Sequence, residues 1–180
     1  MLKIMRIAVY CSARTAIAPE CFEDARTLGW WIGSGGHTLV YGGLQMGLMD
    51  AVASATAEAG GRVMGVVPQS RAQRQHPDNS VSIAVSSLHE RKQTMEENAD
   101  AFVALDGGYG TLDEVMSALA SMSFFSEPKP LILLNRGALY DPLMAIFAEM
   151  ERRGLMYPEV ARQITLCPDI DSLIHALEQL

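Results

Sequence analysis

Three ionisable residues stand out in a 180-residue chain of which only 19% is charged. Arg91 and Lys92 are adjacent, and Glu114 closely follows the Gly-Gly-Tyr-Gly-Thr run at residues 107–111. An arginine can bind a phosphate through two hydrogen bonds, and a lysine adds a compact positive charge. A carboxylate near a sugar phosphate suits a reaction that develops positive charge on the sugar. These three residues are therefore candidates for anion binding and acid–base chemistry.

Glycine-rich turns occur at two places where a strand is expected to lead into a helix. The first turn lies within residues 41–49 and contains Gly43, and the second follows Leu105. Glycine lets backbone N–H groups approach an anion closely, and a following helix N-terminus adds about half a positive charge. A tight turn explains either cluster taken alone. Two clusters at the same edge of one sheet favour a phosphate ligand.

Neither turn matches the common nucleotide-binding motifs. No Gly-Lys-Ser/Thr follows a glycine run, so the ATP-binding loop of P-loop enzymes is not expected. The second turn has Asp113 in place of the third glycine of the dinucleotide motif. The next expected strand, Leu131–Leu134, is followed by Asn135 and not by the acidic residue that would bind a ribose. NAD is therefore a poor alternative.

The charged residues also have purely structural interpretations. Thr111 and Glu114 have the spacing of a capping box, in which Thr111 caps a helix that begins at Leu112. That arrangement puts Glu114 in the first helical turn, beside the glycine run, so capping and chemistry are compatible. Arg91 and Lys92 also fit a solvated face of a helix.

Short β-branched runs alternate with helical patterns along the whole chain. The expected strands are Ile7–Tyr10, Thr38–Tyr41, Arg62–Val67, Val81–Val85, Ala101–Leu105, Leu131–Leu134 and Ile164–Leu166. The expected helices are Pro19–Ser34, Leu48–Ala59, His89–Ala99, Leu112–Met122, Asp141–Arg153 and Asp169–Leu180. Most strands are continuously apolar, which is typical of parallel strands buried on both faces. The pattern predicts an α/β fold with a doubly wound parallel sheet of about seven strands, forming a single domain over residues 1–180.

One segment, Gln69–Ser80, has little apolar content. The simpler interpretation is a solvated loop. The functional interpretation is a mobile flap over a ligand site, because longer loops sometimes cover such sites.

Composition excludes several classes of function. With 21 acidic and 14 basic residues and a net charge of −7, the chain is a poor candidate for nucleic-acid binding. No run of about 18 apolar residues is present, so we expect no membrane span, and Met1–Arg6 does not resemble a signal peptide. Cys11, Cys21 and Cys167 are scattered and odd in number, which indicates neither disulfides nor zinc. We therefore expect a reduced, cytoplasmic protein.

Together, these motifs resemble the LOG family of cytokinin riboside 5′-monophosphate phosphoribohydrolases, long mislabelled as lysine decarboxylases. The segments that carry the resemblance are residues 41–49, 60–68, 88–92, 100–105, 107–114 and 140–143, and the match covers almost the whole chain. The resemblance implies a Rossmann-like fold and usually a homodimer. It also implies hydrolysis of the N-glycosidic bond of a nucleoside 5′-monophosphate, such as AMP or isopentenyl-AMP, to a free base and ribose 5-phosphate.

The resemblance also assigns roles to individual residues. Arg91 and Glu114 match the catalytic pair, with Glu114 stabilising an oxocarbenium-like sugar or activating water and Arg91 positioning it. The candidates for substrate binding, some of which match the family motif less strongly than others, are Lys92, Gly107, Gly108, Tyr109, Gly110, Thr111, Ser12 and Gly43. Neither a cofactor nor a metal is required. A pyridoxal-dependent decarboxylase needs a Schiff-base lysine, and Lys92, the only lysine near the site, reads as an anion-binding group.

Several positions depart from the usual family pattern. Asp106 stands where the motif has proline, and its carboxylate would repel an anion unless it points away or pairs with a cation such as Arg91. Leu44 replaces a glycine, and residues 120–123 replace a Thr-Trp-x-Gln pattern, which suggests altered base recognition. The alternative function is a non-catalytic nucleotide- or cofactor-binding carrier of the same superfamily.

Overall fold

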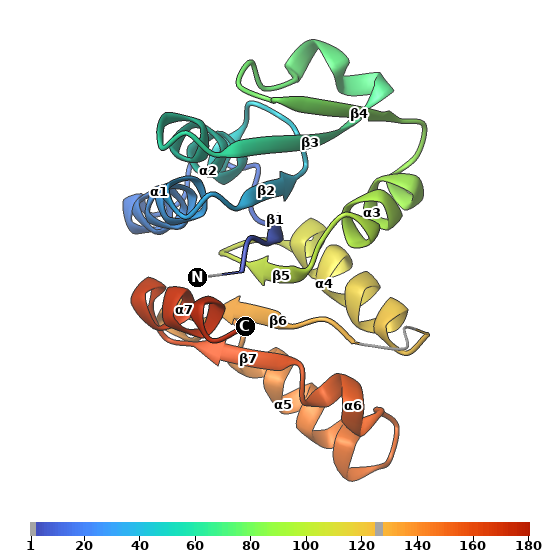
Figure 1. Ribbon diagram of the computed structural model, residues 1–180. Helices are drawn as coiled ribbons and strands as arrows, with labels where there is room; N and C mark the ends of the chain where they lie inside the picture. The colour runs from blue at the N-terminus through green and yellow to red at the C-terminus, as the bar shows by residue number, and fades with distance from the viewer. Residues whose placement is uncertain (1–2, 125–127) are drawn as a thin grey trace.

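A seven-stranded, all-parallel sheet forms the centre of the protein (Figure 1). The computed structural model describes residues 3–124 and 128–180. The strands are β1 (Arg6–Tyr10), β2 (Thr38–Tyr41), β3 (Arg62–Pro68), β4 (Val81–Val85), β5 (Ala101–Ala104), β6 (Leu131–Leu134) and β7 (Ile164–Cys167). Their order across the sheet is β4-β3-β2-β1-β5-β6-β7. The predicted fold class is confirmed.

Helices cover both faces of the sheet, as expected for a doubly wound fold (Figure 1). The helices are α1 (Pro19–Ser34), α2 (Gly47–Glu58), α3 (Leu88–Glu97), α4 (Tyr109–Met122), α5 (Asp141–Arg152), α6 (Pro158–Ala161) and α7 (Ile170–Glu178). The helices α1, α2 and α7 pack on one face, whereas α3, α4, α5 and α6 pack on the other. The short helix α6 was not expected from the sequence. None of the helices in the described part of the chain has the length and apolar character of a membrane span.

The alternation of side chains along the strands creates the two hydrophobic layers. In β1, Ile7 and Val9 enter the layer under α1, α2 and α7, while Ala8 and Tyr10 enter the layer under α3 and α4. The edge strands β4 and β7 are less buried because one of their sides has no neighbouring strand.

The centre of the sheet contains a topological switch point. Strand β1 lies between β2 and β5, so the chain winds outward from it in both directions. Beyond the strands, the Leu105 N–H donates to the Tyr10 carbonyl and the Ser12 N–H donates to the Asp106 carbonyl, both at 3.0 Å. Ligands of open α/β sheets bind at such a point, outside the carboxyl ends of the strands. The two glycine-rich turns follow β2 and β5 and therefore flank it.

The start of α4 differs from the sequence prediction. The helix begins at Tyr109, with Gly108 as an N-cap that forms no side-chain hydrogen bond, so the predicted capping box is wrong. Thr111 is buried as the third helical residue and packs so closely on Gly107 that a side chain there would collide with it. Glu114 consequently lies in the second turn of α4, not the first.

The segment after β3 is anchored to the first glycine turn. Residues 69–74 form a 3₁₀ helix, and residues 69–75 are exposed, in agreement with a solvated loop. The buried residue His76 donates its backbone N–H to the Gly43 carbonyl at 2.9 Å, and the Asn79 side chain donates to the same oxygen at 3.2 Å. The segment therefore supports the glycine turn from behind. Its residues do not line the cavity of the candidate site, so the structure does not support a flap.

Candidate active site

One cavity of about 480 Å³ opens at the switch point. It is lined by Cys11, Ser12, Ala13, Arg14, Met49, Leu88, Arg91, Lys92, Gly108, Tyr109, Gly110, Thr111, Asp113 and Glu114. Met49 belongs to the first turn of α2 and residues 109–111 to the first turn of α4. The N-termini of the two helices that follow the glycine turns thus meet at one cavity, and Glu114 lies in its wall.

Arg91 is held in place by backbone carbonyls. Its helix, α3, begins at a Ser87 cap that accepts a hydrogen bond from the Glu90 N–H. The Arg91 Nε donates to the Val66 carbonyl at 3.0 Å and Nη2 donates to the Gly42 carbonyl at 2.9 Å. These bonds leave Nη1 directed at Glu114.

Glycine is required at position 42 for steric reasons. A Cβ at Gly42 would collide with the Arg91 guanidinium, although the backbone φ there is not unusual. The glycine of this turn therefore admits the arginine side chain. Sequence inspection pointed to the turn but not to this contact.

Glu114 is a mostly buried carboxyl group with one cationic neighbour. Its Oε1 lies 3.4 Å from Arg91 Nη1, and its side chain is 13% exposed. Burial raises the pKa of Glu114 to about 7, with Asp113 adding to the rise while Arg91 and Lys92 oppose it. A carboxyl group with a pKa near neutrality can exchange a proton at physiological pH, as a catalytic acid or base must.

Lys92 forms an ion pair across the mouth of the cavity. Its Nζ lies 2.8 and 2.9 Å from the two carboxylate oxygens of Asp113, which is 59% exposed. An incoming phosphate would therefore either share Lys92 with the exposed Asp113 carboxylate or displace that carboxylate from it. Because both carboxylate oxygens of Asp113 hold its Nζ, this lysine does not fit the Schiff-base role that pyridoxal chemistry needs.

The first turn of α4 presents unpaired backbone donors. The opening N–H groups of an α-helix have no acceptor within the helix, and this helix has no acidic side chain in its first turn to offset its dipole. The side chain of Tyr109 is 94% exposed and Gly110 has no neighbour within 4 Å of a Cβ, so the backbone is accessible. Arg14, which the sequence analysis did not select, adds a cation to the same cavity.

Two predicted substrate-binding residues lie outside this cavity. Gly43 does not line it: its carbonyl accepts hydrogen bonds from the segment after β3 and its backbone (φ +76°) forms the turn, and its substrate-binding role stays a prediction. Gly107 lines an adjacent cavity of about 460 Å³, which shares Ser12, Arg14 and Gly108 with the first. The structure therefore brings together Ser12, Arg91, Lys92, Glu114 and residues 108–111.

Asp106 points to the α1 side of the sheet. It lines the adjacent cavity with Cys21, whose thiol is hydrogen-bonded to it. Burial raises the pKa of Asp106, and the nearby Asp24 adds to the rise, whereas the cation acting on it is Arg136. Of the two arrangements expected from the sequence, the structure shows the one in which Asp106 points away from Arg91.

Replacing Asp106 with asparagine should stabilise the fold at neutral pH. Because its folded-state pKa is raised, the ionised side chain reduces stability above the unfolded value of about 3.9. The gain in Tm should therefore be present at pH 7 and disappear below about pH 4. Thermal unfolding at both pH values measures this, with Glu58→Gln on the exposed end of α2 as the control. An equal gain at both pH values would contradict the electrostatic explanation.

The fold and the cavity define a Rossmann-like α/β protein with its candidate site at the switch point. A family described as "Possible lysine decarboxylase" matches residues 49–177. A cytokinin riboside 5′-monophosphate phosphoribohydrolase of Oryza sativa subsp. japonica is 35% identical over 179 residues, covering 98% of this chain and 74% of that protein. One of Arabidopsis thaliana is 33% identical over 179 residues, covering 98% and 78%. The chain belongs to this family, the LOG family.

A solved structure supports the same fold at lower sequence identity. The molybdenum cofactor binding protein of Rippkaea orientalis superposes with a TM-score of 0.78 at 22% identity, covering 99% of this chain and 98% of that one. At this identity the likeness concerns the fold alone.

Proposed function

We propose that this protein hydrolyses the N-glycosidic bond of a purine nucleoside 5′-monophosphate, with or without an N6 modification, to a free base and ribose 5-phosphate. The observation that carries the proposal is the buried Glu114–Arg91 pair beside the exposed N-terminus of α4. The names of the relatives from Oryza sativa and Arabidopsis thaliana support this reaction class.

The geometry suggests how the reaction proceeds. The phosphate binds the first amides of α4 with Lys92 and Arg14, which directs the ribose toward Glu114. The bond between C1′ and the base nitrogen breaks with its electron pair going to the base, and positive charge develops on the sugar. Ionised Glu114 stabilises that charge or takes a proton from the attacking water. The water oxygen bonds to C1′, and the proton that this water gives up to Glu114 passes to the departing base, so Glu114 ends the cycle ionised.

The direct test is incubation of the protein with AMP and with isopentenyl-AMP, followed by assays for ribose 5-phosphate and free base. Both products should form in equal amounts. Adenosine should be a much poorer substrate because it lacks the phosphate that binds α4. Product no greater than that of Glu114→Ala would exclude the activity for these substrates.

The second candidate function is binding without hydrolysis. The departure from the family motif at Asp106, which precedes the second glycine turn, supports it. A rise in Tm with AMP, without product formation, would favour this alternative.

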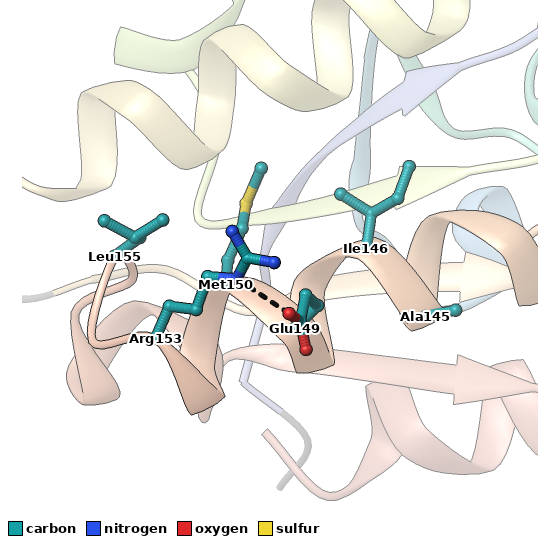
Figure 2. Close-up of a pocket in the computed structure, with 6 residues that line it drawn as sticks. All are labelled: Ala145, Ile146, Glu149, Met150, Arg153 and Leu155. Atoms are coloured by element: carbon teal, nitrogen blue, oxygen red, sulfur yellow. Dashed lines mark hydrogen bonds and ion pairs between the residues drawn. The ribbon is translucent and has the colours of Figure 1, made fainter.

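We also propose that two copies associate through an apolar face formed by α4, α5 and the loop after α5. Figure 2 shows Ile146 and Met150 projecting from α5 on the same side, next to Leu155. This hollow has a volume of about 430 Å³, and Ile146 and Leu155 are 51% and 72% exposed. Met116 of α4 adds to a neighbouring apolar hollow that also contains Met150 and Leu155. Contiguous exposed apolar surface of this kind marks interaction sites.

Changing Ile146 to lysine should convert the dimer to a monomer, because it places a charge in the apolar contact. Sedimentation equilibrium measures the mass. Trp30→Lys, which changes an exposed apolar residue of α1 on the opposite side of the sheet, should remain dimeric. A wild-type protein that sediments at 19.6 kDa would contradict the proposal.

A cytoplasmic location is part of the same proposal. All three cysteines are buried free thiols, which suits a reducing compartment.

A further inference from the structure

Tyr10 has a buried hydroxyl group without a hydrogen-bond partner. It is the last residue of β1, is 1% exposed, and its ring stacks on Phe102 with 6.0 Å between centroids. Among the residues that the structure describes, none accepts or donates a hydrogen bond at its hydroxyl. Buried hydroxyls are nearly always paired, so this group needs an explanation.

Tyr10 ends strand β1, which packs against α4, the helix that carries Glu114. Burial, and then the charges of Glu114 and Glu96, raise the pKa of Tyr10 well above its usual value, so the phenol remains an O–H donor at every working pH. Tyr10 packs in the same layer as Val115 and Met95, which belong to the helices that carry these two carboxyl groups.

The two carboxyl groups differ in how well they are satisfied. The oxygens of Glu96 accept hydrogen bonds from the Ser117 and Ser121 hydroxyls at 2.7 and 2.6 Å. In the described part of the chain, Glu114 receives a single hydrogen bond, the 3.4 Å contact from Arg91. Glu114 is therefore the carboxylate that lacks a strong donor, and Tyr10 is the donor that lacks an acceptor.

We propose that Tyr10 is a positioning residue for Glu114, to whose ionised carboxylate its hydroxyl donates through one water molecule. A hydrogen bond to the ionised form stabilises that form, so Tyr10 opposes the effect of burial on Glu114. Its contribution to catalysis rests on the proposed hydrolase function, but the hydrogen bond itself does not.

Other charged or titratable groups also face Glu114 and must be held constant in a test. They are Arg91 and Lys92 from α3, Asp113 from α4, Cys11 at the end of β1 and Arg14 after it. The substitution Tyr10→Phe changes none of them and removes only the oxygen atom.

The test is an NMR titration of ¹³C-labelled glutamate carboxyl groups in Tyr10→Phe, with the Glu114 signal assigned by its loss in Glu114→Gln. We expect the pKa of Glu114 to rise by about one unit above the wild-type value. Tyr140→Phe is the matched control, because it removes a buried hydroxyl that donates to the Leu105 carbonyl at 2.6 Å. It should lower Tm and leave the Glu114 titration unchanged.

A Glu114 titration that is identical in Tyr10→Phe and in the wild type would overturn the proposal. If the variant does not fold, the wild-type protein provides the answer. Its Tyr10 hydroxyl proton should exchange slowly and its chemical shift should follow the Glu114 titration, and a shift independent of that titration would equally overturn the proposal. The titrations require no substrate. If the Glu114 pKa shifts in Tyr10→Phe but the wild-type protein does not hydrolyse AMP, the hydrogen bond stands and only the proposed hydrolase function is excluded. In an active enzyme, the apparent pKa of the acid limb of the pH–rate profile should rise in Tyr10→Phe by the same amount as the pKa of Glu114.

Discussion

Replacing Glu114 with glutamine should lower the rate of AMP hydrolysis by about 10³-fold while making the folded protein more stable at pH 8. The loss of rate follows because the neutral amide neither stabilises a positively charged sugar nor accepts a proton from water. The gain in stability follows because the ionised carboxylate is buried at 13% exposure. Moving its pKa from 4.5 to about 7 corresponds to about 3 kcal/mol.

The pH dependence gives the sign of both effects. A pKa of about 7 means that Glu114 becomes protonated as the pH falls through neutrality, so wild-type activity should decline below about pH 7. The folded-state pKa lies above the unfolded value, so the favourable contribution to stability is complete below about pH 4 and is lost as the pH rises through 7. The stability difference between Glu114→Gln and the wild type should consequently grow between pH 4 and 8.

Steady-state assays of ribose 5-phosphate release and thermal unfolding at several pH values measure these effects together. Glu58→Gln removes an exposed carboxylate at the far end of α2 and should change neither quantity. Retention of full activity in Glu114→Gln would exclude the assigned role. Loss of both activity and stability would indicate instead that the carboxylate is a structural group.

Replacing Gly42 with alanine should reduce hydrolysis by about 10²-fold without altering any ionisable residue. The added methyl group occupies the position of the Arg91 guanidinium, which must then leave the Gly42 and Val66 carbonyls. Arg91 would no longer support Glu114, and because that cation lowers the pKa of Glu114, the acid limb of the pH–rate profile should shift upward.

The comparison variant for this prediction is Arg91→Lys. This variant leaves Gly42 unchanged. In the wild type three different guanidinium nitrogens contact Val66, Gly42 and Glu114, and the single nitrogen of a lysine cannot reach all three positions at once. Both variants should shift the pH profile in the same direction. Full activity in Gly42→Ala would show that the guanidinium position is not needed for the reaction.

The α/β architecture could be predicted from the sequence because the determinants are local. The runs at β2, β4 and β6 begin and end at the predicted residues. Strand β6 is a continuous apolar run buried along its length, whereas β4 is a partly exposed edge strand that its β-branched residues still indicate. Helix α1 has its predicted bounds, Pro19–Ser34, and Gly35 caps its end. The sheet edge that carries the candidate cavity followed from the parallel topology alone.

The details of the site depended on contacts between distant residues. The spacing of Thr111 and Glu114 predicted a capping box. In the structure α4 begins earlier, at Tyr109, and Thr111 packs closely on Gly107 instead of capping the helix. The contact between the Gly43 carbonyl and the backbone N–H of His76, 33 positions further on, could not be read from the glycine-rich turn itself. The donor–acceptor mismatch of Tyr10 and Glu114 arises from packing between β1 and α4, which no local motif reports.

The four charged side chains that α3 and α4 place at the cavity consist of two cations and two carboxylates. Arg91 pairs with Glu114 and Lys92 with Asp113, so these four groups balance one another when Glu114 is ionised, and Arg14 leaves the cavity with one excess positive charge. A phosphate dianion entering this site brings excess negative charge, which favours the protonated form of Glu114. Ligand affinity and proton uptake are then thermodynamically linked, and departure of the phosphorylated sugar becomes easier as that proton is lost. The buffer pH would thereby set both turnover and occupancy through a single carboxyl group.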